Sequence, residues 1–307
     1  MIGRPVTFRP LRHVWVCAAA IALSGCLAQA TPLGSAPSAL VSTQATVTGD
    51  LRHHAAVASR HLSEKRDVWV YLPPGYASGS TRYPVLYMHD GNNLFDADRA
   101  FMGREWQVDE TAERMIRTGE IPPLIIVGVG NTPARMDEYT WVASELDGKP
   151  AGGKGAQYAR FLVDELKPMI DKTYRTLSDR ENTGVMGSSL GGLMSLYLAR
   201  HHGEVFGKIG AMSPSVWWKD RAVLDEVAFM RPDHRVWLDF GTREGGGEEK
   251  EALRHLTNAR DLSQRFVARG YRHHENLAFM EDPGAGHDEG AWSRRMPNAL
   301  RFLFGKR

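Results

Sequence analysis

The sequence has little cysteine, no long apolar run and no large excess of charge of one sign. Its two cysteines, Cys17 and Cys26, lie within the first thirty residues, so the rest of the chain can form no internal disulfide. The formal net charge is only +2, and Arg4, Arg9 and Arg12 contribute to it with no acid among the same thirty residues. Without those thirty residues, 35 basic residues face 36 acidic ones. This balance argues against a nucleic-acid-binding protein.

The apolar run of residues 14–23 is too short to remain in a bilayer as a spanning helix, and it follows a basic stretch. This order is typical of an export signal, so we expect an exported, periplasmic protein. Two processing sites compete. Leu23-Ser24-Gly25-Cys26 resembles the lipobox of bacterial lipoproteins, in which Cys26 is lipidated and attaches the protein to the membrane. Ala28-Gln29-Ala30 fits ordinary cleavage after Ala30. We prefer the lipobox.

The chain also lacks internal repeats. Residues 31–54 are rich in Ser, Thr, Ala and Pro, so we expect a flexible tether between a signal peptide at 1–30 and a domain at 55–307. In that domain strand-like and helix-like stretches alternate, which predicts an α/β fold with a mostly parallel sheet and helices on both faces. The predicted strands are 68–72, 85–89, 124–129, 183–186, 209–212, 236–240 and 276–279, and the clearest helices are 158–170, 190–201, 249–269 and 291–304.

The central motif is Gly187-Ser188-Ser189-Leu190-Gly191, which has the form G-x-S-x-G. A predicted strand precedes it and a predicted helix follows it. A tight turn from strand to helix lifts a serine hydroxyl out of the sheet into a cleft, and glycines allow the chain to turn closely there. The motif therefore predicts Ser189 as a catalytic nucleophile. The alternative is a glycine-rich loop with a structural serine.

A serine hydroxyl needs a base to become a good nucleophile. His287 is the best-placed histidine, because it follows the last predicted strand and precedes the last helix, where α/β-hydrolases carry their catalytic histidine. The pairs His53-His54, His201-His202 and His273-His274 look like surface residues and have no convincing metal-ligand spacing. We therefore predict His287 as the general base, with no metal and no cofactor.

The triad acid is expected after the strand 236–240. Glu244 lies on the turn beyond the end of this strand, where a carboxylate can orient the imidazole and stabilise its cation. Asp239 lies inside the strand and is expected to be a buried structural acid. Asp288 and Glu289 are too close to His287 in sequence to be first choices.

An oxyanion hole requires two backbone N–H groups that point at the developing alkoxide. One is expected from Leu190, directly after the nucleophile, and the other from the loop His89-Asp90-Gly91-Asn92-Asn93 after an earlier strand. Asn92 is the best-placed donor in this loop. Asp90 and Asn93 are equally well explained as turn formers.

Residues 70–76 (VYLPPGY), 83–91 (YPVLYMHDG) and 212–218 (MSPSVWW), together with the G-x-S-x-G turn, resemble one esterase family. The family includes enterochelin (siderophore) esterases, feruloyl and acetyl xylan esterases, esterase D and mycolyltransferases. The resemblance runs from about residue 55 to the C-terminus and implies the α/β-hydrolase fold. It also implies Ser189 as nucleophile, His287 as histidine, Glu244 as acid and the Asn92 amide as oxyanion donor. Many members carry Asp at the acid position, so Glu244 departs from the pattern.

Three further residues are candidates for substrate binding. Arg135 follows a predicted strand and can pair with an anionic or phenolic group, or equally form a surface ion pair with Asp137 or Glu138. Trp217 and Trp218 follow the next strand, where one of them can form an aromatic wall or pack in the core.

The preferred hypothesis is a serine esterase that hydrolyses small-molecule or glycan-linked carboxylic esters through an acyl-enzyme. Siderophore lactones and aryl or acetyl esters of plant polysaccharides are the main candidates, and the resemblance slightly favours the siderophores. The alternatives are an acyltransferase, a peptidase, or a non-catalytic exported binding lipoprotein on a hydrolase fold, because a fold alone does not determine function.

Overall fold

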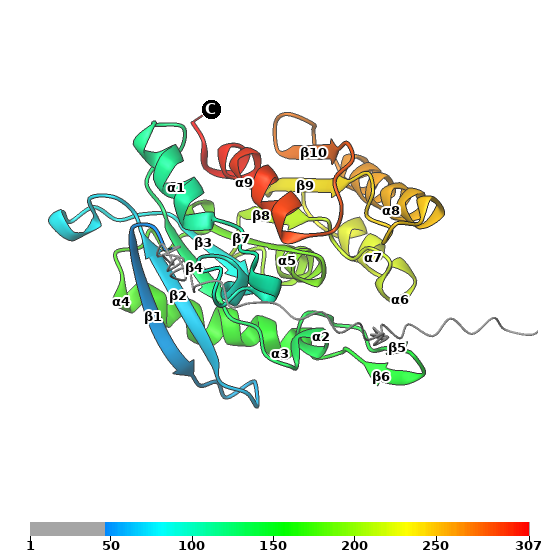
Figure 1. The fold of residues 1–307 in the computed structure, drawn as a ribbon, viewed down its shortest axis with the longest axis horizontal. Helices are drawn as coiled ribbons and strands as arrows, with labels where there is room; N and C mark the ends of the chain where they lie inside the picture. Colours follow the sequence, from blue (N-terminus) through cyan, green and yellow to red (C-terminus); the bar gives the residue numbers. More distant parts are fainter. Residues whose placement is uncertain (1–46, 307) are drawn as a thin grey trace, which may run out of the picture. The chain divides into compact units, whose positions relative to one another are not determined.

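The computed structural model describes residues 47–306. At its centre is an eight-stranded sheet in the order β1-β2-β4-β3-β7-β8-β9-β10 (Figure 1). The six strands from β4 to β10 are parallel, whereas β2 is antiparallel to both β1 and β4. The strands are β1 (Asp50–Val57), β2 (Arg66–Leu72), β3 (Val85–His89), β4 (Ile125–Val129), β7 (Thr183–Ser188), β8 (Lys208–Met212), β9 (Arg235–Gly241) and β10 (Leu277–Asp282).

Helices cover both faces of this sheet. Buried residues of α3, α4, α5, α7 and α8 pack on one face, and those of α1 and α9 pack on the other. Parallel strands that are covered on both sides read as continuous apolar runs, and all five residues of β4 are buried accordingly. The main helices are α1 (Val108–Arg117), α3 (Gly155–Arg160), α4 (Lys167–Thr173), α5 (Leu190–His201), α7 (Val223–Ala228), α8 (Glu249–Ala268) and α9 (Glu289–Phe304).

Smaller elements join these layers. Residues 161–166 form a π-helical turn between α3 and α4, so the predicted helix 158–170 is one continuous helical stretch. The remaining short elements are α2 (Arg135–Glu138), α6 (Trp218–Arg221) and a small hairpin of β5 (Ser144–Leu146) and β6 (Lys149–Ala151). Within residues 47–306, none of the helices has the length and apolarity needed to cross a membrane.

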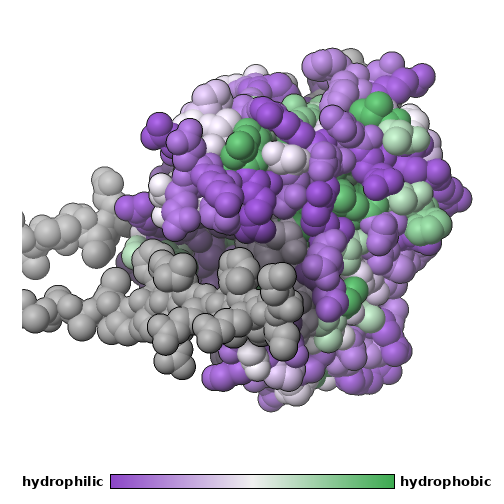
Figure 2. Space-filling view, turned by 90° about the vertical axis from the view of Figure 1, so that its right-hand side faces the viewer, coloured by the Kyte–Doolittle hydropathy of each residue, from purple (hydrophilic) through white to green (hydrophobic). Residues whose placement is uncertain are grey.

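The fold agrees with the predicted α/β class, and each of the seven predicted strands is present. The expected domain boundary is wrong by several residues, because β1 begins at Asp50 and pairs with β2 from Asp50↔Leu72 onward. Residues 50–54 therefore belong to the sheet and not to a tether. The predicted signal peptide, both processing sites and the tether up to residue 46 lie outside the described residues. On the face drawn in Figure 2, most of the described surface is hydrophilic.

Candidate active site

The predicted nucleophile lies at a sharp turn between β7 and α5. Ser189 has φ 56° and ψ −122°, a backbone conformation that costs free energy for a residue with a side chain. Its N–H donates to the carbonyl of Met212 in β8 at 3.0 Å. A Cβ on Gly187 would lie 2.8 Å from the His89 ring and 2.9 Å from the Gly191 carbonyl carbon. Only glycine fits at position 187, and the turn leaves Ser189 partly exposed between buried neighbours.

The predicted base and acid contact each other. His287 Nδ1 lies 2.8 Å from Glu244 Oε2. The Glu244 side chain is fully buried on the turn after β9, whereas the imidazole, on the loop after β10, is 39% exposed. The ring of Trp292 meets the imidazole edge-on, with centroids 5.0 Å apart. Glu244 thus holds the imidazole at Nδ1 and Trp292 packs against it, while the rest of the ring is open to the pockets.

Ser189 and His287 line the same two pockets. Ser189 Oγ is 3.2 Å from Ser215 Oγ and hydrogen-bonded to it. Catalytic hydrogen bonds are often long or misdirected in unliganded enzymes and form when substrate binds. In this structure the Ser189 hydroxyl is therefore hydrogen-bonded to Ser215, and its transfer of a proton to His287 stays a prediction.

The Glu244 carboxylate is fixed by two donors besides the imidazole. Its Oε1 accepts hydrogen bonds from Gly241 N–H at 2.6 Å and from Ser213 Oγ at 2.5 Å. Ser213 Oγ in turn accepts from Trp292 Nε1 at 3.0 Å and from Arg295 Nη2 at 2.8 Å. These contacts leave Oε2 free to hold the imidazole, so orientation of His287 depends on a chain of buried groups.

Arg295 supplies the positive charge of this buried network. It is 1% exposed, and its nitrogens lie 3.3 Å from Asp239 Oδ1, 3.7 Å from Glu244 Oε1 and 4.0 Å from Asp282 Oδ2. Burial raises the pKa of Asp239 to about 6, against the attraction of Arg295. Asp239 also accepts from Trp237 Nε1 at 2.6 Å and is buried as expected, while its purely structural role stays a prediction.

Sequence reasoning did not identify Ser213, Trp292 or Arg295. A signal for Arg295 was present, because it lies at helical spacing among the apolar residues of α9 that pack on the sheet. A charged residue on such a face requires a buried partner. The contribution of Ser213 is harder to see in the sequence, since a single serine after a strand has many roles.

The two predicted oxyanion donors, Leu190 and Asn92, each line a pocket beside Ser189, and their role stays a prediction. Leu190 is the first residue of α5, and the first N–H groups of a helix have no acceptor within the helix. Asn92 lies in a 3-10 turn, Gly91–Asn93, directly after β3, and its Oδ1 accepts from Asn131 N–H at 3.1 Å. A Cβ on Gly91 would lie 2.4 Å from the Gly128 carbonyl carbon. Close packing on β4 therefore holds this turn in place.

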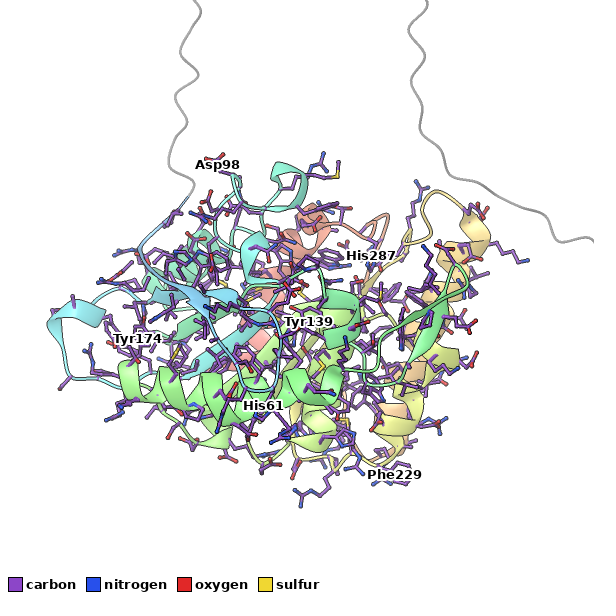
Figure 3. The ribbon with its side chains drawn as sticks, turned by 90° about the horizontal axis from the view of Figure 1, so that it is seen from below. His61, Asp98, Tyr139, Tyr174, Phe229 and His287 are labelled. Carbon is purple, nitrogen blue, oxygen red and sulfur yellow. The ribbon has the colours of Figure 1, made fainter. Side chains whose placement is uncertain are left out.

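Arg135 lines both pockets, but its charge is already engaged. Its Nε and Nη2 donate to the two oxygens of Asp90 at 2.6 and 2.8 Å, and Asn131 Nδ2 also donates to Asp90. The expected alternative pairing with Asp137 or Glu138 is wrong, because Asp137 binds Lys154 and Glu138 binds Arg66. Tyr139 at the end of α2, labelled with His287 in Figure 3, accepts from the Asp90 N–H and supports the same corner.

The two tryptophans have different surroundings. Trp217 lines one of the pockets beside Ser189. Trp218 is 1% exposed and its indole N–H donates to the Val142 carbonyl at 2.9 Å. Trp218 is a core residue, so the expectation that it binds substrate is wrong, while the expectation for Trp217 stays a prediction.

The two pockets share Arg135, Ser189 and His287 as lining residues. The first, here called the Trp217 pocket, has a volume of about 450 Å³. The second, here called the Trp292 pocket, has a volume of about 420 Å³. Both volumes are within the range of small-molecule sites. Apart from Ser189, Arg135 and His287, the Trp217 pocket includes Trp217, Phe240, Glu251 and His255, and the Trp292 pocket includes Asp90, Asn92, Phe101, Trp106, Glu289 and Trp292.

One group of acids in the described part of the chain is close enough to share a metal ion. Oxygens of Glu105, Asp109 and Glu110 lie within 4.8 Å of one another. These residues belong to the start of α1 and the loop before it, and none of them lines either pocket beside Ser189.

Comparison with known proteins identifies the family of the chain. Residues 59–303 match the sequence model of the family described as "Putative esterase". The chain is 30% identical to YbbA of Bacillus subtilis over 254 residues, which cover 81% of this chain and 96% of YbbA. It is 28% identical to the ferri-bacillibactin esterase BesA of Bacillus subtilis over 246 residues, 73% of this chain and 81% of BesA.

Solved structures show the same fold at lower identity. The BES protein from Bacillus cereus has a TM-score of 0.67 and 23% identity, covering 87% of this chain and 99% of that protein. The enterobactin esterase FES from Shigella flexneri has a TM-score of 0.65 and 20% identity, covering 84% of this chain and 60% of that one. The fold is therefore that of the α/β-hydrolases, and the chain belongs to this esterase family.

Proposed function

We propose that the protein is a serine esterase that hydrolyses carboxylic esters through an acyl-enzyme on Ser189. The observation that carries the proposal is the pairing of His287 Nδ1 with the buried Glu244 carboxylate in the same pockets that the strained Ser189 lines. A nucleophile, a base and an orienting acid in one place are the requirements of acyl transfer to serine.

The chemistry assigns a step to each group. His287 accepts the Ser189 proton as Oγ attacks the ester carbonyl, and Glu244 stabilises the resulting imidazolium. The backbone N–H groups of Leu190 and Asn92 stabilise the negative charge on the carbonyl oxygen. The imidazolium then protonates the leaving alcohol. A water molecule next gives a proton to His287 and attacks the acyl-enzyme. The imidazolium returns this proton to Ser189 Oγ as the acyl C–O bond breaks, which releases the acid and regenerates Ser189 and neutral His287.

The names of related proteins support two substrate classes. They include siderophore esterases such as BesA and a feruloyl esterase of Xylanibacter ruminicola. Esters of siderophores and aryl esters linked to glycans are accordingly the first substrates to test. Transfer of the acyl group to an alcohol instead of water is an alternative outcome at the same Ser189.

We further propose that the protein is exported and attached to a membrane through lipidated Cys26. Support comes from the basic stretch, the apolar run and the lipobox-like Leu23-Ser24-Gly25-Cys26. Radiolabelled palmitate incorporation in cells that express the full chain or its Cys26→Ala variant tests this: loss of label in the variant supports lipidation, and an unlabelled parent protein excludes it.

The enzymatic proposal is tested with a fluorophosphonate probe and p-nitrophenyl acetate and butyrate. We expect labelling and turnover by the parent protein and loss of both in Ser189→Ala. Ser215→Ala is the informative control, since Ser215 is the hydroxyl bonded to Ser189 and would lose the label instead if it were the nucleophile. A folded parent protein that is neither labelled nor active would favour the non-catalytic binding lipoprotein.

A further inference from the structure

The two pockets beside Ser189 are lined by more negative than positive groups. Among the described residues that line them, the carboxylates are Asp90, Glu244, Glu251 and Glu289, and the single guanidinium belongs to Arg135. With the histidines neutral, the formal charge of this lining is −3. A cleft with charged walls of one sign attracts substrates of the opposite sign and repels those of the same sign.

Arg135, the guanidinium that lines both pockets, is already paired and is not available to an anionic substrate. Arg135 gives two of its N–H groups to Asp90 in a two-point pair, a geometry that makes strong charge-assisted bonds. Its side chain is 30% exposed and that of Asp90 is 8% exposed. The pair is therefore close to neutral as seen from the pocket.

Two of the remaining carboxylates also have partners. Glu244 is buried between His287 and Arg295. Glu251 pairs with Arg254 at 2.5 Å on the surface of α8. Their charges are offset by these neighbours and contribute little to the field in the cleft.

Glu289 differs from these carboxylates in its ion pairing. In the described part of the chain, no ion pair joins it to a cation, although it lines the Trp292 pocket together with Ser189 and His287. Burial raises the pKa of Glu289, the nearby Asp288 and Asp90 raise it further, and His287 lowers it. At the first position of α9 the helix dipole favours its ionised form. An ionised Glu289 is thus the one uncompensated charge on the walls of the cleft, within the described residues.

We propose, as an extension of the esterase function above, that this cleft selects esters without negative charge and that Glu289 is the residue that discriminates against anionic ones. Iron-loaded catecholate siderophores fall in the disfavoured class, because their phenolate charges outnumber that of the ferric ion. Uncharged aryl esters and iron-free, uncharged lactones fall in the favoured class.

The test uses two matched pairs of esters that differ in one negative charge. On the acyl side the pair is p-nitrophenyl butyrate and mono-p-nitrophenyl succinate, and on the alcohol side it is methyl 4-acetoxybenzoate and 4-acetoxybenzoate. The kcat/KM ratio of the neutral to the anionic member is measured at roughly pH 8, well above the ordinary range of carboxyl pKa values. The proteins are the parent, Glu289→Gln and the exposed control Glu145→Gln, which lies in β5 outside both pockets.

We expect the neutral ester to be preferred and, in at least one pair, the ratio to fall by about three- to tenfold in Glu289→Gln, as for one unit charge at close range. Glu145→Gln should keep the parent ratio, and added salt should reduce the discrimination of the parent. Equal or better turnover of the anionic esters by the parent, or an unchanged ratio in Glu289→Gln for both pairs, overturns the inference. Loss of turnover of the neutral esters in the parent is instead the failure of the esterase proposal itself.

Discussion

At the scale of single residues, the candidate site depends on how a buried carboxyl group is hydrogen-bonded and oriented. Glu244 is surrounded by three donors, Gly241 N–H, Ser213 Oγ and His287 Nδ1, and Arg295 lies 3.7 Å away. Burying a carboxylate without such partners costs several kcal/mol. These partners thus stabilise and orient the longer Glu side chain at a position where many members of the family carry Asp.

Replacing Glu244 with Gln tests this arrangement. The variant keeps the size of the side chain but removes the charge that stabilises the imidazolium, so we expect kcat to fall by about 10²–10⁴-fold. The change in KM should be much smaller, because the carboxylate acts mainly in the transition state. Steady-state kinetics on p-nitrophenyl butyrate measure both quantities.

The matched control for that variant is Glu281→Gln, which breaks an exposed ion pair with Arg260 outside both pockets. Its kinetics should match the parent. If Glu244→Gln retained a kcat within threefold of the parent, Glu244 would be a structural acid, and the triad would need another carboxylate.

At this scale the sequence predicted where along the chain the site residues lie. It did not predict which residues distant in sequence contact one another. Ser189, His287 and Glu244 each follow the end of a strand, and the order of strands along the chain brings such residues together at one edge of a parallel sheet. Ser213 and Arg295 act through contacts across about eighty residues, and no local pattern encodes which distant groups meet.

At the scale of elements, the site is a set of turns held by close backbone packing. The Gly91–Asn93 turn after β3 lies against Gly128 of β4 with no room for a methyl group on Gly91. The same turn carries the Asn92 amide and Asp90, which binds Arg135. A shift of this turn would thus move the predicted oxyanion donor and one wall of the Trp292 pocket together.

We expect Gly91→Ala to lower both activity and stability. The added Cβ would lie 2.4 Å from a backbone carbon of β4, so the turn must move, and such overpacking costs about 1–3 kcal/mol. The activity loss should be at least about tenfold, since removing one oxyanion donor costs about 10²–10³-fold. Denaturant unfolding and p-nitrophenyl butyrate kinetics measure the two effects.

Gly79→Ala provides the comparison for that variant. Gly79 has an extended backbone with φ −139°, and its added Cβ would be 3.9 Å from the nearest heavy atom outside its two chain neighbours, the Thr81 nitrogen. Its stability should stay within about 0.5 kcal/mol of the parent. A Gly91→Ala protein that behaved like Gly79→Ala would show that the turn is free to move without loss of the site.

The buried strands could be predicted from the sequence, whereas the edge strand could not. The central strands β3 and β4 are short, largely apolar runs, which is the pattern that indicates buried strands. The same reasoning missed β1 because it is an edge strand in which no residue is buried, with the sequence DLRHHAAV. Such strands carry polar side chains on the open edge and resemble a loop in sequence.

At the scale of the whole molecule, stability should depend on pH through carboxyl groups outside the active site. Burial, reinforced by the neighbouring Glu110, raises the pKa of Asp109 to about 8, and burial with Glu110 and Asp96 nearby raises the pKa of Glu105 to about 7. Asp109 Oδ2 accepts a hydrogen bond from the Thr48 N–H at 2.6 Å, whereas Asp109 Oδ1 has no hydrogen-bond partner. These acids favour the protonated form in the folded protein.

The sign of the effect follows from proton binding. Between the ordinary aspartate pKa near 3.8 and the folded value of about 8, the folded state holds a proton that the unfolded state has released. The stabilisation by Asp109 is therefore complete below about pH 4 and is lost as the pH rises towards 8. Asp109→Asn, which stays neutral and can still accept from Thr48, should gain stability over the parent as the pH rises.

Chemical unfolding of the parent and Asp109→Asn at roughly pH 5, 7 and 8.5 measures this effect, and we expect a relative gain of about 1–3 kcal/mol for the variant between the extremes. The exposed Asp98→Asn controls for a general change in net charge and should run parallel to the parent. Parallel curves for Asp109→Asn as well would mean that this carboxyl is ionised in the folded protein despite its burial. A cation bound among Glu105, Asp109 and Glu110 would be one way to keep it so, and chelator treatment at pH 8.5 would then lower the stability of the parent but not of the variant.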